Sequence, residues 1–473
     1  MKILLIQARF TVHFGYITPP LGLISLSAFL KRAGFRDVEV MHPEILGGWP
    51  GCLEERLRKF KPDIVGISAM TAQARSMREI AALVKRVSPE TLVLAGGPYA
   101  THYPEKCAAD PAIDAAVLHE GELTLLELVR LREGGLPFDG VRGIAFRSGK
   151  EIVRTPPRDF IEDLDSLPLP DWGALDLGAY RNFLPCSILA YKQRYMSVMN
   201  SRGCPYRCTF CHNVMGKKFR AQSPERVVEE LSVLHSEHGI THIEVIDDIA
   251  NCDPERFKAV LRAIAASGLK LKIYLAGGLR GDLLDEETID LMPAAGVVDL
   301  TGAVESGSPR VQELIKKNLD LGRIKRMIAY AARKGLYVQG LFMIGFPGET
   351  MRDMWKTLCF AADSKLHFMM IATCFGFRGT ELGDGLDQRA AMNPENDVSV
   401  YEGYSFTSCS HLPPRKIKLM KFLINLVFYY NPFRLWRLIR ALPNRNLALA
   451  GVFLRKIVQK TIIFKWPSVG HRP

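Results

Sequence analysis

The sequence has no apolar run long enough to cross a membrane. The apolar stretch at 422–430 is nine residues long and includes Asn425, whereas a membrane-spanning helix needs about 20 apolar residues. The first seven residues form a short β-like run rather than the apolar core of a secretory signal. We therefore expect a globular, cytoplasmic protein without transmembrane helices.

Outside one short segment, the ten cysteines form no cluster. Without a signal peptide they indicate a reducing compartment, where disulfides are rare. We interpret the scattered cysteines as small apolar residues, most of them buried, although Cys186 and Cys374 are candidates to face an active site. The scattered set is Cys52, Cys107, Cys186, Cys252, Cys359, Cys374 and Cys409.

Acidic residues are absent between Arg415 and Pro473. The 13 Lys and Arg residues of this tail leave 49 of the chain's 62 for the remainder, against 50 Asp and Glu. The formal net charge of +12 therefore belongs to the tail, and the body of the chain is close to neutral. The tail and the body need separate explanations.

One segment, residues 204–211, places three thiols within eight residues, directly after a strand-like run at 196–199. Thiolates bind zinc, copper(I) or iron-sulfur clusters, and three ligands from one tight loop leave a position on the metal centre open. A structural zinc site would normally add a fourth Cys or a His. His212 follows too closely to serve. We therefore favour an iron-sulfur cluster over zinc.

The spacing Cys-x3-Cys-x2-Cys, with an aromatic residue before the last Cys, resembles the radical S-adenosylmethionine (SAM) superfamily. The resemblance implies that Cys204, Cys208 and Cys211 hold a 4Fe-4S cluster whose open iron binds the amino acid end of SAM. A ferredoxin-like electron carrier would supply a fourth Cys in the same segment, so a catalytic cluster is favoured.

Residues 1–150 predict an α/β domain with a doubly wound parallel sheet. Aliphatic runs at 3–6, 38–41, 64–67, 92–95 and 115–118 alternate with helical patterns. Such sheets bind ligands beyond the carboxyl ends of their strands, where this sequence places small and turn residues. Each of these turns alone is more typical of an ordinary βα connection.

Taken together, the turns resemble the cobalamin-binding domain that precedes many radical SAM domains. The resemblance implies cobalamin contacts from Pro20, Gly22, Ser68, Thr71, Gly96, Gly97, Glu120 and Gly121. Tyr99 replaces the His that often follows Gly-Gly-Pro, with His102 nearby. The sequence has no Asp-x-His-x-x-Gly loop, so we expect no axial His ligand from that motif.

Prolines between 151 and 194 predict a stiff linker that docks through Leu169 and Trp172. Residues 195–390 then contain six strand-like runs separated by helical patterns, with a helix start at Ser223-Pro224. This alternation predicts an open, partial (β/α)6 TIM-like barrel with its site at the carboxyl ends of the strands.

The polar and glycine residues at those ends again match the radical SAM superfamily in order. The resemblance implies that Phe210 lies by the adenine, that Glu305 and Ser306 lie by the ribose and methionine, and that the turn at 345–349 approaches the adenosine. Arg280 is expected to contact SAM or substrate, and Asp247 and Asp248 replace a frequent Gly-Gly-Glu. The implied turn residues are Gly345, Pro347, Gly348 and Glu349.

Residues 391–473 predict a helical, basic, amphipathic region. One helical face carries Leu435, Leu438, Ile439 and Leu442, and the opposite face carries Arg434, Arg437 and Arg440. With Trp436, Phe453 and Trp466, this region suits peripheral contact with the anionic inner face of a membrane, or packing against the barrel. Nucleic acid is disfavoured because the basic residues alternate with bulky aliphatic ones.

The family resemblance implies a cobalamin-dependent methyltransferase that acts on an unactivated carbon through a 5′-deoxyadenosyl radical and methylcobalamin. The substrate would be a small or lipid-like molecule, and the electron donor a flavodoxin or ferredoxin. Two alternatives stay open: a radical oxidoreductase or cyclase acting on a lipid or tetrapyrrole, and a non-catalytic cobalamin or iron-sulfur carrier.

Overall fold

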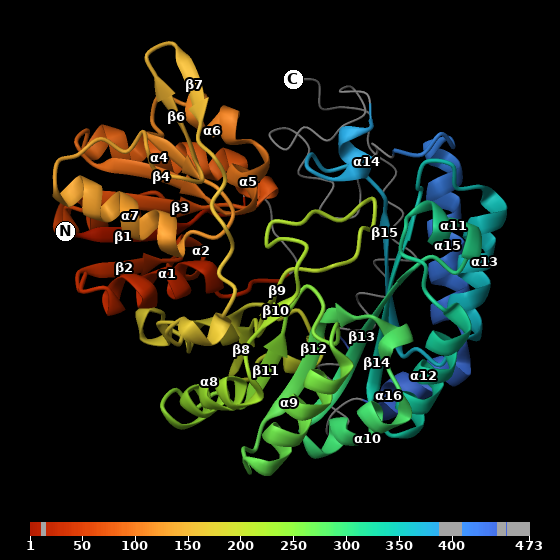
Figure 1. Cartoon of the computed structure of the whole chain (residues 1–473). Coiled ribbons are helices and arrows are strands. Elements are labelled where there is room, and N and C mark those ends of the chain that lie inside the picture. The colour runs from red at the N-terminus through yellow and green to blue at the C-terminus, as the bar shows by residue number, and fades with distance from the viewer. Residues whose placement is uncertain (11–15, 387–408, 442–450, 452–473) are drawn as a thin grey trace.

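The computed structural model describes residues 1–10, 16–386, 409–441 and 451 of the chain (Figure 1). Its described residues contain two large sheets, each built mainly of parallel strands, and one two-stranded antiparallel sheet. The carboxyl-end loops of the two large sheets lie close together. The boundary predicted at 390 falls outside the described residues.

The first sheet has the strand order β2-β1-β3-β4-β5-β6-β7, and its first five strands are parallel, as predicted. Helices cover both faces: α1 and α7 pack in one apolar core, and α3 and α4 pack in the other. The strands are β1 (Ile3–Gln7), β2 (Val38–Met41), β3 (Ile64–Ser68), β4 (Leu92–Gly96), β5 (Ala115–Val117), β6 (Ile144–Ser148) and β7 (Glu151–Arg154). The α-helices are α1 (Leu21–Arg32), α2 (Pro43–Leu46), α3 (Gly51–Phe60), α4 (Ala74–Val87), α5 (Gly97–His102), α6 (Pro104–Ala109) and α7 (Glu122–Glu133).

The hairpin of β6 and β7 is an antiparallel extension that the sequence interpretation missed. Its strands expose Arg147, Ser148, Glu151 and Arg154, so they lack the continuous aliphatic run of a buried parallel strand. The first sheet therefore continues to Arg154, a few residues beyond the predicted domain boundary.

In a doubly wound sheet of this order, the ligand crevice is expected between β1 and β3, where the strand order reverses. The chain leaves these adjacent strands in opposite directions, and ligands of doubly wound sheets bind outside such a switch point. The loops after β1, β3, β4 and β5, which carry the predicted cobalamin contacts, lie at this edge.

The linker crosses from the first sheet to the second through short 3-10 turns: η2 (Leu164–Ser166), η3 (Trp172–Ala174), η4 (Ala179–Asn182) and η5 (Ile188–Ala190). Trp172 is buried in the core of the second domain, as predicted, while Leu169 is half-buried. Asp171 also accepts hydrogen bonds from Ser27 and Lys31 of α1, so the linker is fixed to both domains.

The second sheet has six parallel strands in the order β15-β14-β13-β12-β11-β8, all near the predicted positions. Its neighbours follow chain order, and β8 and β15 are its edges. Ser223 caps α8 as predicted. The strands are β8 (Tyr195–Val198), β11 (His242–Val245), β12 (Lys272–Leu279), β13 (Val297–Glu305), β14 (Tyr337–Ile344) and β15 (Phe368–Thr373), and the connecting helices are α8 (Pro224–Ser236), α9 (Pro254–Ala266), η6 (Gly281–Leu283), α10 (Glu286–Ala294), α11 (Pro309–Leu314), α12 (Leu321–Arg333) and α13 (Met351–Asp363).

The described part of the tail packs on the second domain. α15 (Pro414–Tyr429) lies against α13 and β15, and the Tyr429 hydroxyl bonds to the backbone of Met369. No helix of the described residues is both long and apolar enough to span a bilayer. Phe453, Trp466 and Leu442 of the predicted amphipathic region lie outside the described residues.

The sequence predicts that Arg434 lies on the solvent-facing basic side of a tail helix. This prediction is wrong for Arg434, which lies in α16 (Pro432–Ala441). Arg434 is buried, and its guanidinium donates hydrogen bonds to the carbonyls of Ala361, Ala362, Ser364 and Leu366 at and beyond the end of α13. A helix ends with unpaired carbonyls, and a cation can bind them. The pattern of apolar spacing could not reveal that partner.

Two carboxyls are buried inside the second sheet. Glu244 accepts hydrogen bonds from the Ser187 amide and the Ser197 hydroxyl, and Asp299 accepts from the Ser187 hydroxyl and the Leu275 amide. In the part of the chain that the structure describes, no ion pair joins either carboxyl to a cation. Burial therefore raises the pKa of each to about 7.

Because these two carboxyls are buried, we expect the protein to lose stability as the pH rises from about 4 to about 7. Their folded pKa lies above the unfolded value of about 4, so the stabilisation is full below pH 4 and is lost as pH rises through about 7. We expect the double variant Glu244→Gln/Asp299→Asn to lose less unfolding free energy than the parent between pH 5 and 8, by on the order of a few kcal/mol. Urea unfolding at several pH values measures this. The exposed Glu237→Gln is the control, and an unchanged pH slope in the double variant contradicts the prediction.

Candidate functional site

The three clustered cysteines lie in a loop at the carboxyl ends of the second sheet. We define the cluster loop as residues 203–219, between β9 (Ser201–Arg202) and β10 (Arg220–Ala221), which pair with each other. The loop extends toward the first domain (Figure 1). Gly203 has φ +83°, and a Cβ there would lie 2.3 Å from the Lys218 carbonyl oxygen. The loop can close only because this residue is glycine.

Contacts with other segments hold the cluster loop. The Thr209 amide donates to the Ile315 carbonyl, and the Thr209 carbonyl accepts from the Leu382 amide, at 3.0 and 2.8 Å. The Arg280 guanidinium lies 3.8 Å from the centre of the Tyr206 ring and also pairs with Asp282. Arg280 therefore supports the cluster loop, a role that the sequence interpretation did not assign to it.

The three thiols interact with one another. Burial raises the pKa of all three, and for Cys211, where the neighbouring Cys208 and Cys204 add to this effect, the pKa reaches about 12. Among the described residues, no three His, Cys, Asp or Glu side chains are close enough to chelate a single metal ion. Three thiols from one loop can hold an iron-sulfur cluster and leave one position on it open.

Phe210 is next to the turn that follows β14. Its ring centre lies 5.7 Å from that of Phe346, and Lys317 Nζ lies 5.9 Å from it on another side. In the turn, Gly345 and Gly348 have positive φ. The Glu349 carboxylate accepts hydrogen bonds from the Gly345 and Phe346 amides, and burial raises its pKa to about 7.

The Glu349 side chain therefore shapes its own turn, and the Gly348 amide is bonded to His411, so Pro347 is the part of the turn left to contact a nucleoside. Pro347 is half-buried, and the Gly348 carbonyl is bonded to Arg310.

The two acidic residues after β11 face different partners. Asp247 is buried and accepts hydrogen bonds from the Asn200 amide and the Ser201 hydroxyl, which ties β11 to the turn after β8. Asp248 accepts from the Gly203 amide at the start of the cluster loop. Both side chains thus brace the loop.

Glu305 ends β13 in a left-handed conformation, and Ser306 follows it. Glu305 has φ +63°, rare for a residue with a side chain, and its carboxylate pairs with Lys317 at 2.9 Å. Such strain is frequent at functional sites. The Ser306 hydroxyl is buried and bonds to Thr357 of α13, so its side chain is not free for a ligand.

The loops at the edge of the first sheet approach one another closely. Gly97 has φ +81°, and a Cβ there would lie 2.8 Å from the Ser68 hydroxyl. Thr101 bonds to the Gly97 carbonyl and to the His119 amide, which joins the loops after β4 and β5. The missing Cβ of Gly97 thus lets the loops after β3 and β4 pack directly against each other at the edge where the ligand of such a sheet is expected.

The remaining predicted residues of this edge are placed as follows. Gly96 ends β4, and Thr71 is buried in the 3-10 helix η1 (Thr71–Gln73). Pro20 caps α1 and Gly22 lies in its first turn, while Gly121 packs on Leu26 of the same helix.

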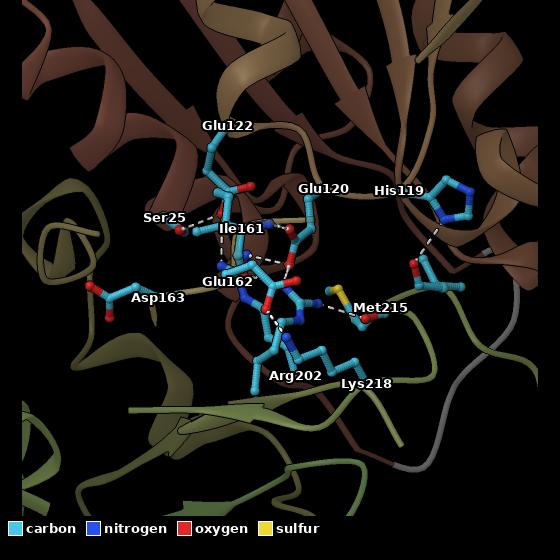
Figure 2. A network of polar contacts seen from close by, with 12 residues as sticks. Ser25, His119, Glu120, Glu122, Ile161, Glu162, Asp163, Arg202, Met215 and Lys218 are labelled. Atoms are coloured by element: carbon cyan, nitrogen blue, oxygen red, sulfur yellow. Dashed lines mark hydrogen bonds and ion pairs between the residues drawn. The ribbon is translucent and has the colours of Figure 1, made fainter. Parts of the chain in front are cut away.

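Glu120 lies between the two domains rather than in the crevice. One carboxylate oxygen accepts from Arg202 Nη1 and Arg220 Nη1 at 3.0 and 2.7 Å, and the other accepts from the Ile161 amide (Figure 2). Glu122 pairs with Arg202 at 2.7 Å. The predicted contact of Glu120 with cobalamin therefore depends on its backbone.

Sequence reasoning missed six residues of the site. His119, Glu122, Arg202 and Arg220 join the two domains, whereas Tyr206 and Lys317 make contacts within the second domain. Lone charged residues beside a short strand carry no periodic signal, so only the flanking position of the two arginines could have suggested them.

Comparison with known proteins places these two domains. The model of the radical SAM superfamily matches residues 200–361, and that of the B12 binding domain matches residues 10–129. The uncharacterized methyltransferase PH0819 of Pyrococcus horikoshii is 32% identical over 390 residues, 81% of this chain and 82% of that protein. The cytidylyl-2-hydroxyethylphosphonate methyltransferase of Streptomyces wedmorensis is 31% identical over 434 residues, 80% of each chain.

A solved structure shares the fold. The radical SAM methyltransferase TsrM from Kitasatospora setae, with cobalamin and a 4Fe-4S cluster bound, matches with a TM-score of 0.71 at 20% identity, over 92% of this chain and 90% of that chain. The fold and the cysteine loop thus define a two-domain radical SAM protein. The chain belongs to the radical SAM superfamily, among the members with a B12 binding domain. It is a radical SAM enzyme, with a 4Fe-4S cluster, SAM and cobalamin as cofactors.

The close packing at Gly203 predicts how the cluster loop responds to substitution. In Gly203→Ala the added Cβ cannot fit against the Lys218 carbonyl, so we expect the loop to open and the iron content per chain to fall by more than half. Iron and sulfide analysis after anaerobic reconstitution measures this. Gly51→Ala is the control, because a Cβ there meets nothing within 4 Å. Full iron content in Gly203→Ala contradicts the prediction.

Proposed function

We propose that this protein is a cobalamin-dependent radical SAM methyltransferase that acts on an unactivated carbon. Two relatives above 30% identity bear methyltransferase names. The observation that carries the proposal is the contact between the two cofactor-bearing regions. His119 Nδ1, beside the crevice of the first sheet, donates to the Val214 carbonyl of the cluster loop at 3.0 Å. A substrate at this interface can meet both cofactors.

The proposed roles of the residues follow from their positions. Cys204, Cys208 and Cys211 hold the cluster. When bound, the cluster and SAM supply a hydrogen-abstracting radical, and cobalamin supplies the methyl group. Phe210, backed by the buried Phe346, forms an aromatic wall for the adenine, and the left-handed backbone at Glu305 presents polar groups to the rest of SAM. No general base is required for hydrogen abstraction.

The proposed domain division follows the sequence prediction. The cobalamin-binding domain comprises about residues 1–150, the linker 151–194, the partial barrel 195–390 and the basic region 391–473. The two domains meet at the cluster loop, and a substrate held between them would be shielded from water, which protects a radical from side reactions. The proposed electron donor is a flavodoxin or ferredoxin, and the substrate is a small or lipid-like molecule.

The proposal predicts which products form from SAM. The anaerobically reconstituted enzyme with cobalamin and dithionite should form 5′-deoxyadenosine and S-adenosylhomocysteine, detected by mass spectrometry. Cys208→Ala should form no 5′-deoxyadenosine, because the cluster loses one of its three ligands. Cys359→Ala is the matched control, because Cys359 is an exposed residue of α13 and lies outside the cluster loop.

The other outcomes separate the alternatives. 5′-Deoxyadenosine without S-adenosylhomocysteine supports a radical oxidoreductase or cyclase. Neither product, from enzyme with a full cluster and bound cobalamin, supports a non-catalytic carrier and contradicts the proposal.

We also propose that α16 touches an anionic membrane surface. Phe433 and Trp436 are 78% and 54% exposed on this helix, and Arg440 stacks 3.8 Å from Trp436. Exposed aromatic and basic residues on one helix favour binding at the lipid interface. We do not assign the membrane contact to α15, because α15 packs on α13 and β15.

Vesicle sedimentation tests this membrane contact. The double variant Phe433→Ser/Trp436→Ser should bind anionic phosphatidylglycerol vesicles at least about tenfold more weakly than the parent, because burial of one Phe side chain is worth about 1.5–3 kcal/mol. Trp355→Ser is the matched control, as Trp355 is equally exposed on α13. Equal binding by the parent and both variants contradicts the proposal that α16 contacts the membrane.

A further inference from the structure

Two arginines mark the base of the cluster loop. Arg202 in β9 and Arg220 in β10 are direct partners in the antiparallel pair, at the two ends of the loop. Both donate to the same oxygen of Glu120, which comes from the loop after β5 of the first domain. Arg202 also pairs with Glu122. We call Glu120, Glu122, Arg202 and Arg220 the clasp (Figure 2).

The clasp joins three segments that are far apart in sequence. The second Glu120 oxygen accepts from the Ile161 amide of the linker at 2.8 Å. Arg220 donates to the carbonyls of Ile161 and of Met215 in the cluster loop, at 2.5 and 2.7 Å. First domain, linker and cluster loop thus meet at one carboxylate.

The clasp is buried and balanced in charge. The four side chains are 2–14% exposed, and two guanidinium groups face two carboxylates. Buried ion pairs contribute little net stability compared with apolar groups of the same size, but their directional bonds fix geometry. Arg220 also stacks 4.9 Å from Phe160, whose ring contacts His119, the residue that bonds to Val214. The cluster loop is therefore restrained at its two ends, by Arg202 and Arg220, and again at Val214.

An exposed ion pair provides an internal comparison. Glu162 of the linker and Lys218 of the cluster loop also join neighbouring segments, but they are 64% and 71% exposed. Exposed pairs of this kind restrain geometry weakly. If attaching the linker to the cluster loop were enough to fix the position of the loop, the pair of Glu162 and Lys218 would be enough.

We propose that Glu120 is a positioning residue that sets the distance and orientation of the 4Fe-4S cluster relative to the cobalamin. It acts through Arg202 and Arg220, which fix the base of the cluster loop against the first domain. This inference deepens the proposed function and rests on it only for the placement of the two cofactors. It is independent of which substrate is methylated.

Magnetic coupling between the two cofactors provides the test. Reduced 4Fe-4S cluster and cob(II)alamin are both paramagnetic, and their dipolar coupling falls steeply with distance, so electron paramagnetic resonance reports their spacing. The holoenzyme should give one defined coupling. Glu120→Gln, which keeps the shape but removes the charge, should broaden or lose that coupling while retaining iron and cobalamin. Glu162→Gln should match the parent.

A second variant and a second measurement cover a failure of Glu120→Gln to fold. Arg202→Lys keeps the buried positive charge but cannot bridge Glu120 and Glu122 in the same way, and it should also broaden the coupling. Hydrogen–deuterium exchange of the full chain should be severalfold faster at 203–219 in Glu120→Gln than in Glu162→Gln.

The outcomes separate this proposal from the proposed function. A coupling and a loop exchange that are unchanged in both clasp variants overturn the positioning role, whatever products form. If the parent enzyme fails to form S-adenosylhomocysteine but shows a coupling that Glu120→Gln loses, the methyltransferase proposal fails and the positioning role stands. If the parent does not bind both cofactors, the exchange measurement alone decides.

Discussion

The cluster loop has to hold three thiols in place without a hydrophobic core of its own. Most of its residues between β9 and β10 are exposed or half-buried and form no regular structure. Its conformation therefore depends on bonds from outside: Arg280 on Tyr206, backbone bonds at Thr209, and the clasp at Glu120. The parallel-sheet domain and the B12 binding domain each supply part of this support, so neither domain alone specifies the loop.

Much of the polar chemistry at the carboxyl ends of the second sheet serves the protein itself. Asp247 fixes the turn after β8, Ser306 fixes the start of α11 to α13, and Glu349 shapes the turn after β14. What stays available to ligands at these strand ends is aromatic surface and the three thiols. This division suits radical chemistry, in which the cofactors react and the protein orients and shields them.

The architecture was predictable from sequence because buried parallel strands are continuous aliphatic runs, and all eleven such strands were found near their positions. The β6–β7 hairpin was missed since half of its residues face solvent. At the site, residue type and order located the loops, but not the direction of each side chain. Glu120 and Arg434 show the limit: both are charged residues beside turns or on helices, and only tertiary contacts reveal that both are buried.

The bonds from Arg434 to the end of α13 also bear on how the protein is synthesised. The edge strand β15 and the last carbonyls of α13 acquire their cover only when α15 and α16 have been translated. Domains usually fold as units in the order in which they leave the ribosome. Here the first domain can close early, whereas the edge strand of the second sheet stays uncovered by these helices until residues 414–441 have emerged. An uncovered sheet edge can pair with other chains, so α15 and α16 protect the newly made second domain from association.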